Sequence, residues 1–184
     1  GAKEYGVLVK KNSVDGLQAR KWKALGPTGG DLRLVRARKR PVKEIDYGFV
    51  GDVEEVNSRE LRLLLNENVV PVIAPLTHDG KGQLLNTNAD TMASEIATEL
   101  SAYYNIYLFF CFEKKGVLLD EKDETSMIYE LDSDLFEKYK DEGIISAGMI
   151  PKLENGFRAK RKGVKEVLIT NSQNIANGRG TRLI

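Results

Sequence analysis

The 184-residue sequence is 41% hydrophobic and carries 28 basic and 27 acidic residues. Its length suits one domain, or a large part of a two-lobed one, and the near balance of charge argues against nucleic acid and membrane surfaces as partners. It contains no signal peptide and no apolar stretch of membrane length, and its single cysteine, Cys111, has no partner for an intrachain disulfide. We therefore expect a cytoplasmic α/β protein in which Cys111 is a buried thiol.

The N-terminal part predicts a surface helix followed by a tight turn. Residues 3–23 mix apolar residues with Lys, Gln and Arg, although two glycines weaken the helical pattern. Residues 27–31, Pro-Thr-Gly-Gly-Asp, predict a turn that glycine permits. Such a turn can also approach a phosphate, but no GKS/T or GxGxxG pattern is present. Simple turn chemistry is the favoured interpretation.

Basic residues concentrate between Arg33 and Lys43, and this stretch has two possible interpretations. It resembles a nucleic-acid-binding stripe, but it lacks interleaved aromatic residues, and acidic residues follow at once in Glu44 and Asp46. The apolar residues around it alternate, as in strands that expose one charged face. An exposed β-hairpin region at about residues 32–56 is therefore favoured over RNA binding.

A short helix and a buried strand are predicted next. The helix would be capped by Ser58 and end near Asn66. The run 69–76 is too apolar for a half-solvated strand, so it predicts a strand buried on both faces of a parallel sheet. Residues 77–80 predict a turn. We expect His78, the only histidine, to be a loop residue without a catalytic role, because no nucleophile and no metal-ligand spacing accompany it.

Residues 84–90, Leu-Leu-Asn-Thr-Asn-Ala-Asp, connect this strand region to a predicted helix whose apolar residues recur every four positions over 92–100. Open α/β sheets place their ligands near such junctions. The amides of Asn86 and Asn88 can donate and accept hydrogen bonds, and Asp90 falls in the first helical turn. An asparagine cap followed by an aspartate that the helix dipole favours would explain the same residues, so both interpretations stay open.

The second half predicts another ligand region. Residues 106–112 predict a strand buried on both faces, and the loop 113–116 follows its end. Residues 120–125 predict an acidic, solvated loop, and Asp132 or Ser133 can cap the helix after it.

A further helix is predicted within residues 143–155, because Pro151 suits a first helical turn. Gly148 permits close backbone approach there, and the helix N-terminus offers N–H donors. Lys152 opposes the helix dipole, and a bound anion would explain its position, although an exposed lysine costs little there. A strand at 167–170 then follows.

Several stretches in this order resemble the amino-acid kinase family: KRPVKEIDYGFVGDVEEVN, VVPVIAPLTHDGKGQLLNTNADTMASEIA, GIISAGMIPKLENGF and the closing GTRL. The resemblance covers the chain from about Tyr5 onward. It implies a three-layer αβα sandwich around a mainly parallel sheet, with residues 1–184 as one domain that forms the C-terminal, ATP-binding portion. It also implies MgATP-dependent phosphorylation of the γ-carboxylate of N-acetyl-L-glutamate, or of another N-acylglutamate, in arginine biosynthesis by a homodimer.

The resemblance assigns roles to individual residues. Lys152 is similar to the lysine that stabilises charge on the transferring phosphoryl group, and Asp90 to the carboxylate that organises the catalytic lysines. Asn86 and Asn88 are similar to the substrate-binding positions. Phosphoryl transfer needs mainly alignment and charge neutralisation. The residues that would border ATP are Glu113, Lys114, Lys115, Gly116, Ser146, Ala147 and Gly148.

The sequence departs from the family pattern in three places. The family's N-terminal lobe, with its own catalytic lysine, has no counterpart, so little or no kinase activity is expected of this chain alone. The Thr-Asp or Ser-Asp pair that usually follows the buried strand in the family is replaced within residues 111–115. Ala147 occupies a position where the family commonly has glycine. Two alternatives therefore stay open: a non-catalytic nucleotide-binding or regulatory module, and a carbamate or nucleoside-monophosphate kinase of the same family.

Overall fold

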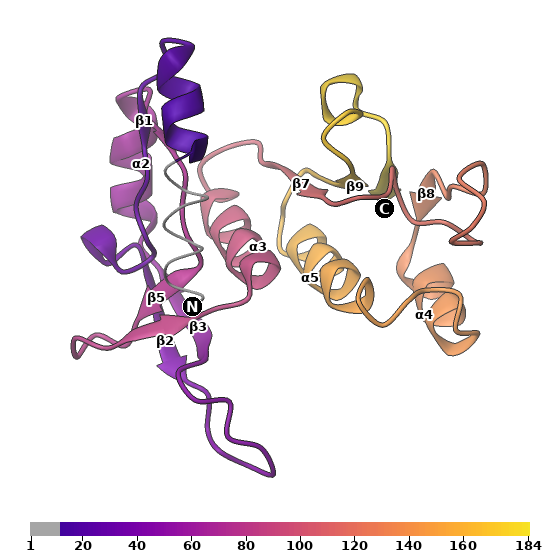
Figure 1. Cartoon of the computed structure of the whole chain (residues 1–184), viewed down its shortest axis with the longest axis horizontal. Helices are drawn as coiled ribbons and strands as arrows, with labels where there is room; N and C mark the ends of the chain where they lie inside the picture. The colour runs from indigo at the N-terminus through magenta and orange to yellow at the C-terminus, as the bar shows by residue number, and fades with distance from the viewer. Residues whose placement is uncertain (1–11) are drawn as a thin grey trace. The chain divides into compact units, whose positions relative to one another are not determined.

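A computed structural model describes residues 12–184. The chain divides into two compact units, residues 1–92 (unit 1) and residues 93–184 (unit 2). Each unit combines helices with strands (Figure 1), which confirms the predicted α/β class. The expectation of a single domain stays a prediction. Within residues 12–184, no helix is long and apolar enough to cross a membrane.

Unit 1 contains short strands that form both parallel and antiparallel pairs. Residues 12–19 are helical, and the rest of the predicted N-terminal helix, residues 3–11, lies outside the described residues. Parallel pairs join β1 to β4 and β2 to β5, whereas β2–β3 and β5–β6 are antiparallel. The elements are β1 (Ala24–Leu25), η1 (Asp31–Arg33), β2 (Val35–Lys39), β3 (Gly51–Val56), α2 (Ser58–Asn66), β4 (Val70–Pro71), β5 (Leu76–His78), β6 (Leu84–Asn86) and the start of α3 (Ala89–Leu100).

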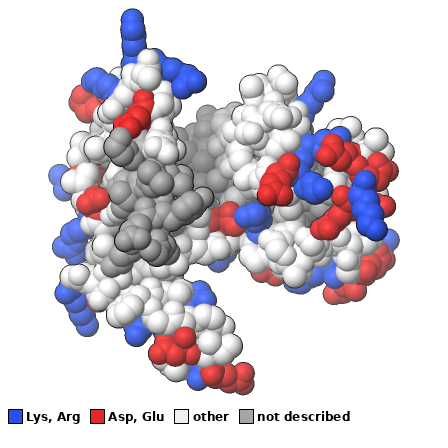
Figure 2. Space-filling view, in the orientation of Figure 1, with Lys and Arg blue, Asp and Glu red and all other residues white. Residues whose placement is uncertain are grey.

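The basic stretch lies on the predicted hairpin. β2 and β3 pair in antiparallel register, and the loop between them extends away from the rest of unit 1 (Figure 1). The guanidinium of Arg36 lies 2.6 Å from Glu54, and that of Arg40 lies 2.6 Å from Asp52. Basic side chains of β2 and the following residue are therefore paired with acidic side chains of β3. Figure 2 shows both signs of charge interspersed on the visible face.

The run 69–76 differs from its prediction. A parallel neighbour is present, since β4 pairs with β1, but the run is split between β4 and β5 and most of it is only half-buried. Pro71 and Pro75 lack the N–H that a continuous strand would donate. His78 is not a loop residue: it ends β5, is buried, and its Nδ1 accepts a hydrogen bond from the Gly80 N–H at 3.0 Å.

Unit 2 is built on one four-stranded sheet in the order β7-β9-β10-β8, in which β7–β9 and β10–β8 are parallel. Helix α5 packs against β9 and β10. Gly156 permits this close packing, because a Cβ there would lie 2.6 Å from Cδ1 of Leu183. Its elements are the remainder of α3, β7 (Tyr107–Cys111), β8 (Glu130–Leu131), α4 (Ser133–Asp141), α5 (Ile150–Arg161), β9 (Glu166–Thr170), η2 (Ile175–Asn177) and β10 (Thr181–Leu183).

The prediction that β7 is buried on both faces is wrong. Leu108 and Phe110 belong to the core, but Tyr107 and Phe109 are 48% and 37% exposed. Successive side chains of a strand point to opposite faces of the sheet, and the alternating burial of β7 shows that only one of its faces is covered. Cys111 is exposed and is not a buried thiol. Partial burial nevertheless raises the pKa of its thiol, which disfavours the reactive thiolate.

The N-terminal cap of α4 gives a stability prediction. The side chain of Asp132 accepts a hydrogen bond from the Leu135 N–H at 2.7 Å, so Asp132 and not Ser133 is the cap. Asp132→Ala is expected to lower the free energy of unfolding by about 1 kcal/mol. Ser133→Ala serves as the control and should change it by less than about 0.5 kcal/mol. Denaturant titration measures both, and equal losses would contradict the assignment.

Candidate functional site

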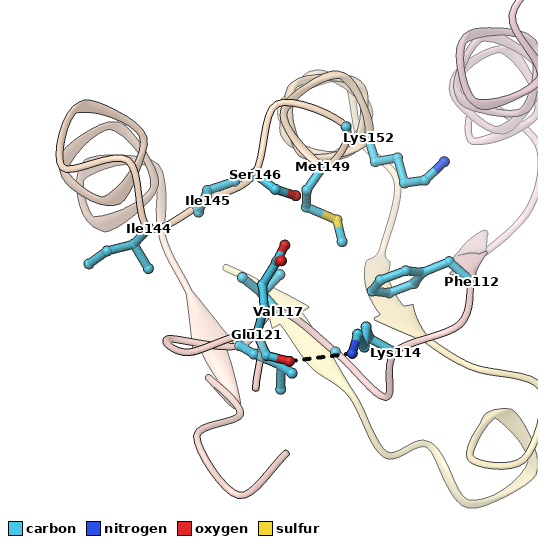
Figure 3. A pocket seen from close by; sticks show the side chains of 12 residues that line it. Phe112, Lys114, Val117, Glu121, Ile144, Ile145, Ser146, Met149 and Lys152 are labelled. Carbon is cyan, nitrogen blue, oxygen red and sulfur yellow. Dashed lines mark hydrogen bonds between the residues drawn. The ribbon is translucent and has the colours of Figure 1, made fainter. Parts of the chain in front are cut away.

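An open cavity of about 180 Å³ lies in unit 2, between the loop that follows β7 and the segment that leads from α4 into α5 (Figure 3). One part of its wall is apolar and the other carries charged and small polar residues. The lining residues are Phe112, Lys114, Gly116, Val117, Leu118, Glu121, Ile144, Ile145, Ser146, Gly148, Met149 and Lys152.

The N-terminus of α5 forms one wall of this cavity. Pro151 lies in its first turn, and neither a side-chain cap nor an acidic residue is found there. The N–H groups of Met149 and Ile150 both point back to the carbonyl of Ser146, at 2.9 and 3.3 Å, so the chain already turns helically before α5 begins. The N–H of Lys152 is also used within the chain, since it donates to the carbonyl of Met149 at 3.1 Å. The partial positive charge of the helix N-terminus and the positive charge of Lys152 nevertheless favour an anion nearby.

The loop after β7 forms the opposite wall and is held in place from behind. Gly116 is buried, and a Cβ on it would lie 2.8 Å from both Met127 Sδ and Thr181 Oγ1. The hydroxyl of Thr181 accepts a hydrogen bond from the Val117 N–H at 2.8 Å. The ammonium of Lys114 donates to the carbonyl of Glu121 at 3.4 Å (Figure 3). These contacts stabilise the conformation of the loop, whose residues Lys114, Gly116 and Val117 line the cavity.

Several residues that the sequence suggested for a ligand site share this cavity. Lys152 lines it together with Lys114, Gly116, Ser146 and Gly148. Three further candidates are not among its lining residues: Glu113, Lys115 and Ala147. Lys115 instead pairs with Glu124 at 3.6 Å and borders a second cavity.

Sequence reasoning missed most of the cavity wall. Phe112 and Met149 line the cavity from positions next to the predicted residues. From sequence alone, an apolar residue that lines a cavity cannot be distinguished from one that lies in the core. Glu121 was assigned to a solvated loop, and only the tertiary structure brings it to the cavity.

The remaining candidates belong to unit 1. Asn86 ends β6 with its side chain exposed. Asn88 caps α3, since its Oδ1 accepts hydrogen bonds from the Thr91 N–H at 2.9 Å and the Thr91 hydroxyl at 3.2 Å. Asp90 lies in the first turn of α3. The capping interpretation is therefore confirmed for Asn88, and its amide NH₂ is the group that the cap does not use.

A buried pair of hydroxyls supports the segment that carries these residues. Oγ1 of Thr77 and Oγ1 of Thr87 lie 2.8 Å apart, and the Thr87 hydroxyl also donates to the carbonyl of Gly51 at 3.3 Å. Gly51 itself must lack a side chain, because a Cβ there would lie 2.8 Å from the Cβ of Leu85. These contacts hold the end of β6 and therefore position Asn86.

The glycine-containing turn at residues 27–31 is organised by its own carboxylate. Asp31 Oδ2 accepts hydrogen bonds from the N–H of Thr28 at 2.7 Å and from its hydroxyl at 2.9 Å. A carboxylate in this place repels an incoming phosphate. The geometry is that of the turn chemistry favoured from the sequence.

Comparisons with known proteins agree on one family. The sequence model described as "Amino acid kinase family" matches residues 7–171. An acetylglutamate kinase of Parabacteroides distasonis is 56% identical over 179 residues, which are 97% of this chain and 70% of that relative. The crystal structure of smu.665 from Streptococcus mutans UA159 has a TM-score of 0.80 at 29% identity and covers 96% of this chain and 66% of its own. The structure of Giardia carbamate kinase, at 15% identity, has a TM-score of 0.66 over 100% of this chain and 70% of its own, a likeness of fold alone.

Proposed function

Because the chain belongs to the amino acid kinase family, we propose that it acts as an acetylglutamate kinase, which transfers the γ-phosphoryl group of ATP to the γ-carboxylate of N-acetyl-L-glutamate in arginine biosynthesis. The 56% identity to an acetylglutamate kinase supports this activity. The chain spans 70% of that relative. The activity is therefore proposed for the chain joined to the remaining length of its relatives, called here the full-length enzyme.

The observation that carries the proposal is the cavity in unit 2, where Lys114 and Lys152 line a largely apolar recess next to a helix N-terminus. In our proposal the base of ATP packs on the apolar wall, and the phosphates lie toward Ser146, Gly148 and Lys152. The ammonium of Lys152 then stabilises the charge that spreads over the transferring phosphoryl oxygens.

Mg²⁺ is proposed to arrive with the nucleotide as part of the substrate. Within residues 12–184, no group of three or more His, Cys, Asp and Glu side chains is placed to hold a metal ion. A magnesium ion that is held mainly by phosphate oxygens and water needs only one or two protein carboxylates.

The residues of unit 1 are proposed to serve the acceptor. The exposed amide of Asn86 and the unused NH₂ group of Asn88 can donate hydrogen bonds to the amino-acid end of N-acetylglutamate. The carboxylate of Asp90 is proposed to orient the catalytic lysines of the full-length enzyme. The γ-carboxylate is already ionised at neutral pH, so the reaction needs no strong general base.

An acceptor screen tests the proposed activity. ADP formation by the full-length enzyme is measured with MgATP and N-acetylglutamate, N-succinylglutamate, carbamate or a nucleoside monophosphate. We expect turnover with an N-acylglutamate and none with the other two acceptors. Turnover with carbamate or a nucleoside monophosphate alone would assign another activity of the family. ATP binding without turnover of any acceptor would instead support a regulatory module.

A cytoplasmic location and a homodimer are parts of the same proposal. The proposed location rests on the proposed use of ATP as a substrate. The homodimer rests on analogy with the family, and sedimentation equilibrium of the full-length enzyme would measure it.

A further inference from the structure

Within the acidic segment 120–125, which lies in the loop between β7 and β8, one of the four acidic residues differs from the other three. Three acidic residues stabilise the loop itself. Asp120 Oδ1 accepts a hydrogen bond from the Lys122 N–H at 2.9 Å. Asp123 Oδ1 accepts from the N–H and the hydroxyl of Thr125, at 2.8 and 2.6 Å, which lowers the pKa of Asp123. The carboxylate of Glu124 pairs with Lys115.

The carboxylate of Glu121 has no hydrogen-bond or ion-pair partner among residues 12–184, where the one hydrogen bond of Glu121 is that which its backbone carbonyl accepts from the Lys114 ammonium. Its side chain lines the cavity and points into it (Figure 3). The loop thus places the two carboxylate oxygens of Glu121 in the cavity as hydrogen-bond acceptors. The contacts of the other three acidic residues stabilise the backbone around Glu121. Replacing the Glu121 side chain therefore removes no hydrogen bond and no ion pair within residues 12–184.

A carboxylate in this position restricts which part of a nucleotide can lie beside it. An ionised carboxylate accepts hydrogen bonds and cannot donate them, and it repels a triphosphate. In the view of Figure 3 it lies between Ile144 on one side and Lys114 and Lys152 on the other. The sugar of a nucleotide connects the base to the phosphates, and its two hydroxyl groups are hydrogen-bond donors.

We propose that the carboxylate of Glu121 forms the ribose subsite of this cavity and accepts hydrogen bonds from the 2′- and 3′-hydroxyl groups of ATP. This inference rests on the proposed function, because it takes the cavity as the nucleotide site. Glu121 then determines specificity for ribonucleotides: a site built to bind a hydroxyl group discriminates against an analogue that lacks it.

The test compares ATP with 2′,3′-dideoxy-ATP, which keeps the base and the triphosphate. Dissociation constants of both Mg²⁺ complexes are measured by calorimetry for the full-length enzyme and for its Glu121→Ala and Glu124→Ala variants. We expect the unsubstituted enzyme to bind ATP about tenfold more tightly than the dideoxy analogue. Glu121→Ala should abolish this preference. Glu124→Ala, which removes a neighbouring carboxylate outside the cavity, should leave it within about twofold of its value.

The ratio of the two constants is the decisive quantity, because removing a negative charge shifts the affinity for both triphosphates alike and the shift cancels. If the unsubstituted enzyme binds ATP but shows no preference, or if Glu121→Ala keeps the preference, the ribose subsite is wrong and the proposed function stands. If the enzyme does not bind MgATP at all, the proposed function fails and the inference fails with it.

Discussion

Replacing Lys152 by methionine is expected to lower kcat of the full-length enzyme by about 10²- to 10³-fold, the usual loss when one charge-stabilising group is removed from a transition state. Methionine keeps much of the apolar stem but removes the ammonium beside the N-terminus of α5. Since the negative charge on the phosphoryl oxygens is redistributed during transfer, the loss should appear mainly in kcat, with KM for ATP within a few-fold of its original value. Steady-state kinetics with N-acetylglutamate as acceptor measure both.

Lys160→Met is the matched control. Lys160 lies on the same helix and is also half-buried, but its ammonium donates to the carbonyl of Lys165 at 2.9 Å, and it does not line the cavity. The control should keep kcat within about twofold. A Lys152→Met variant that loses only ATP affinity, with unchanged turnover at saturation, would contradict a role in the transition state.

Replacing Asn86 by alanine is expected to raise KM for N-acetylglutamate by about tenfold or more, because a hydrogen bond to a charged partner contributes about 1.5–3 kcal/mol. KM for ATP should stay within about twofold, since the amide is proposed to contact only the acceptor. The variant should fold normally, because the Asn86 side chain is exposed and the sheet is held through its backbone N–H, which donates to the carbonyl of Phe49 at 2.7 Å.

Two further variants separate substrate binding from structure. Asn88→Ser retains a helix-capping side chain but removes the amide NH₂, so a raised KM for N-acetylglutamate would come from lost substrate contact and not from a lost cap. Asn177→Ala, an exposed asparagine of unit 2, should change neither constant. Equal increases of both KM values in Asn86→Ala would contradict the role assigned to Asn86.

The sequence was most informative for helices, because apolar periodicity and a characteristic residue at the helix start mark where a helix lies. Helices α2, α3 and α5 occur where periodicity, an asparagine junction and Pro151 predicted them. The predicted cap of α2 is wrong, because Asn57 and not Ser58 accepts the capping hydrogen bond, from the Glu60 N–H at 3.3 Å. The sequence was least informative for uniformly apolar runs. The run 106–112 contains no polar residue at alternate positions, so nothing in it showed that one face of β7 would be uncovered.

The candidate site shows the same limit. Lys152 could be proposed because a lysine in the first turn of a helix opposes the helix dipole, and Gly148 because glycine permits close backbone approach. Glu121 could not be found in this way, since an acidic residue in an acidic loop is locally ordinary. Its importance depends on the fold, which directs this one side chain into the cavity while its neighbours bind within the loop or to Lys115.

Photoaffinity labelling with an azido analogue of ATP, followed by peptide mapping, tests most directly the claim that the cavity in unit 2 holds the nucleotide. We predict that the label attaches to peptides from residues 112–121 or 144–152 of the full-length enzyme and that excess MgATP prevents this labelling. Labelling confined to peptides from residues 12–92, or labelling of the cavity peptides that excess MgATP does not reduce, would contradict the account.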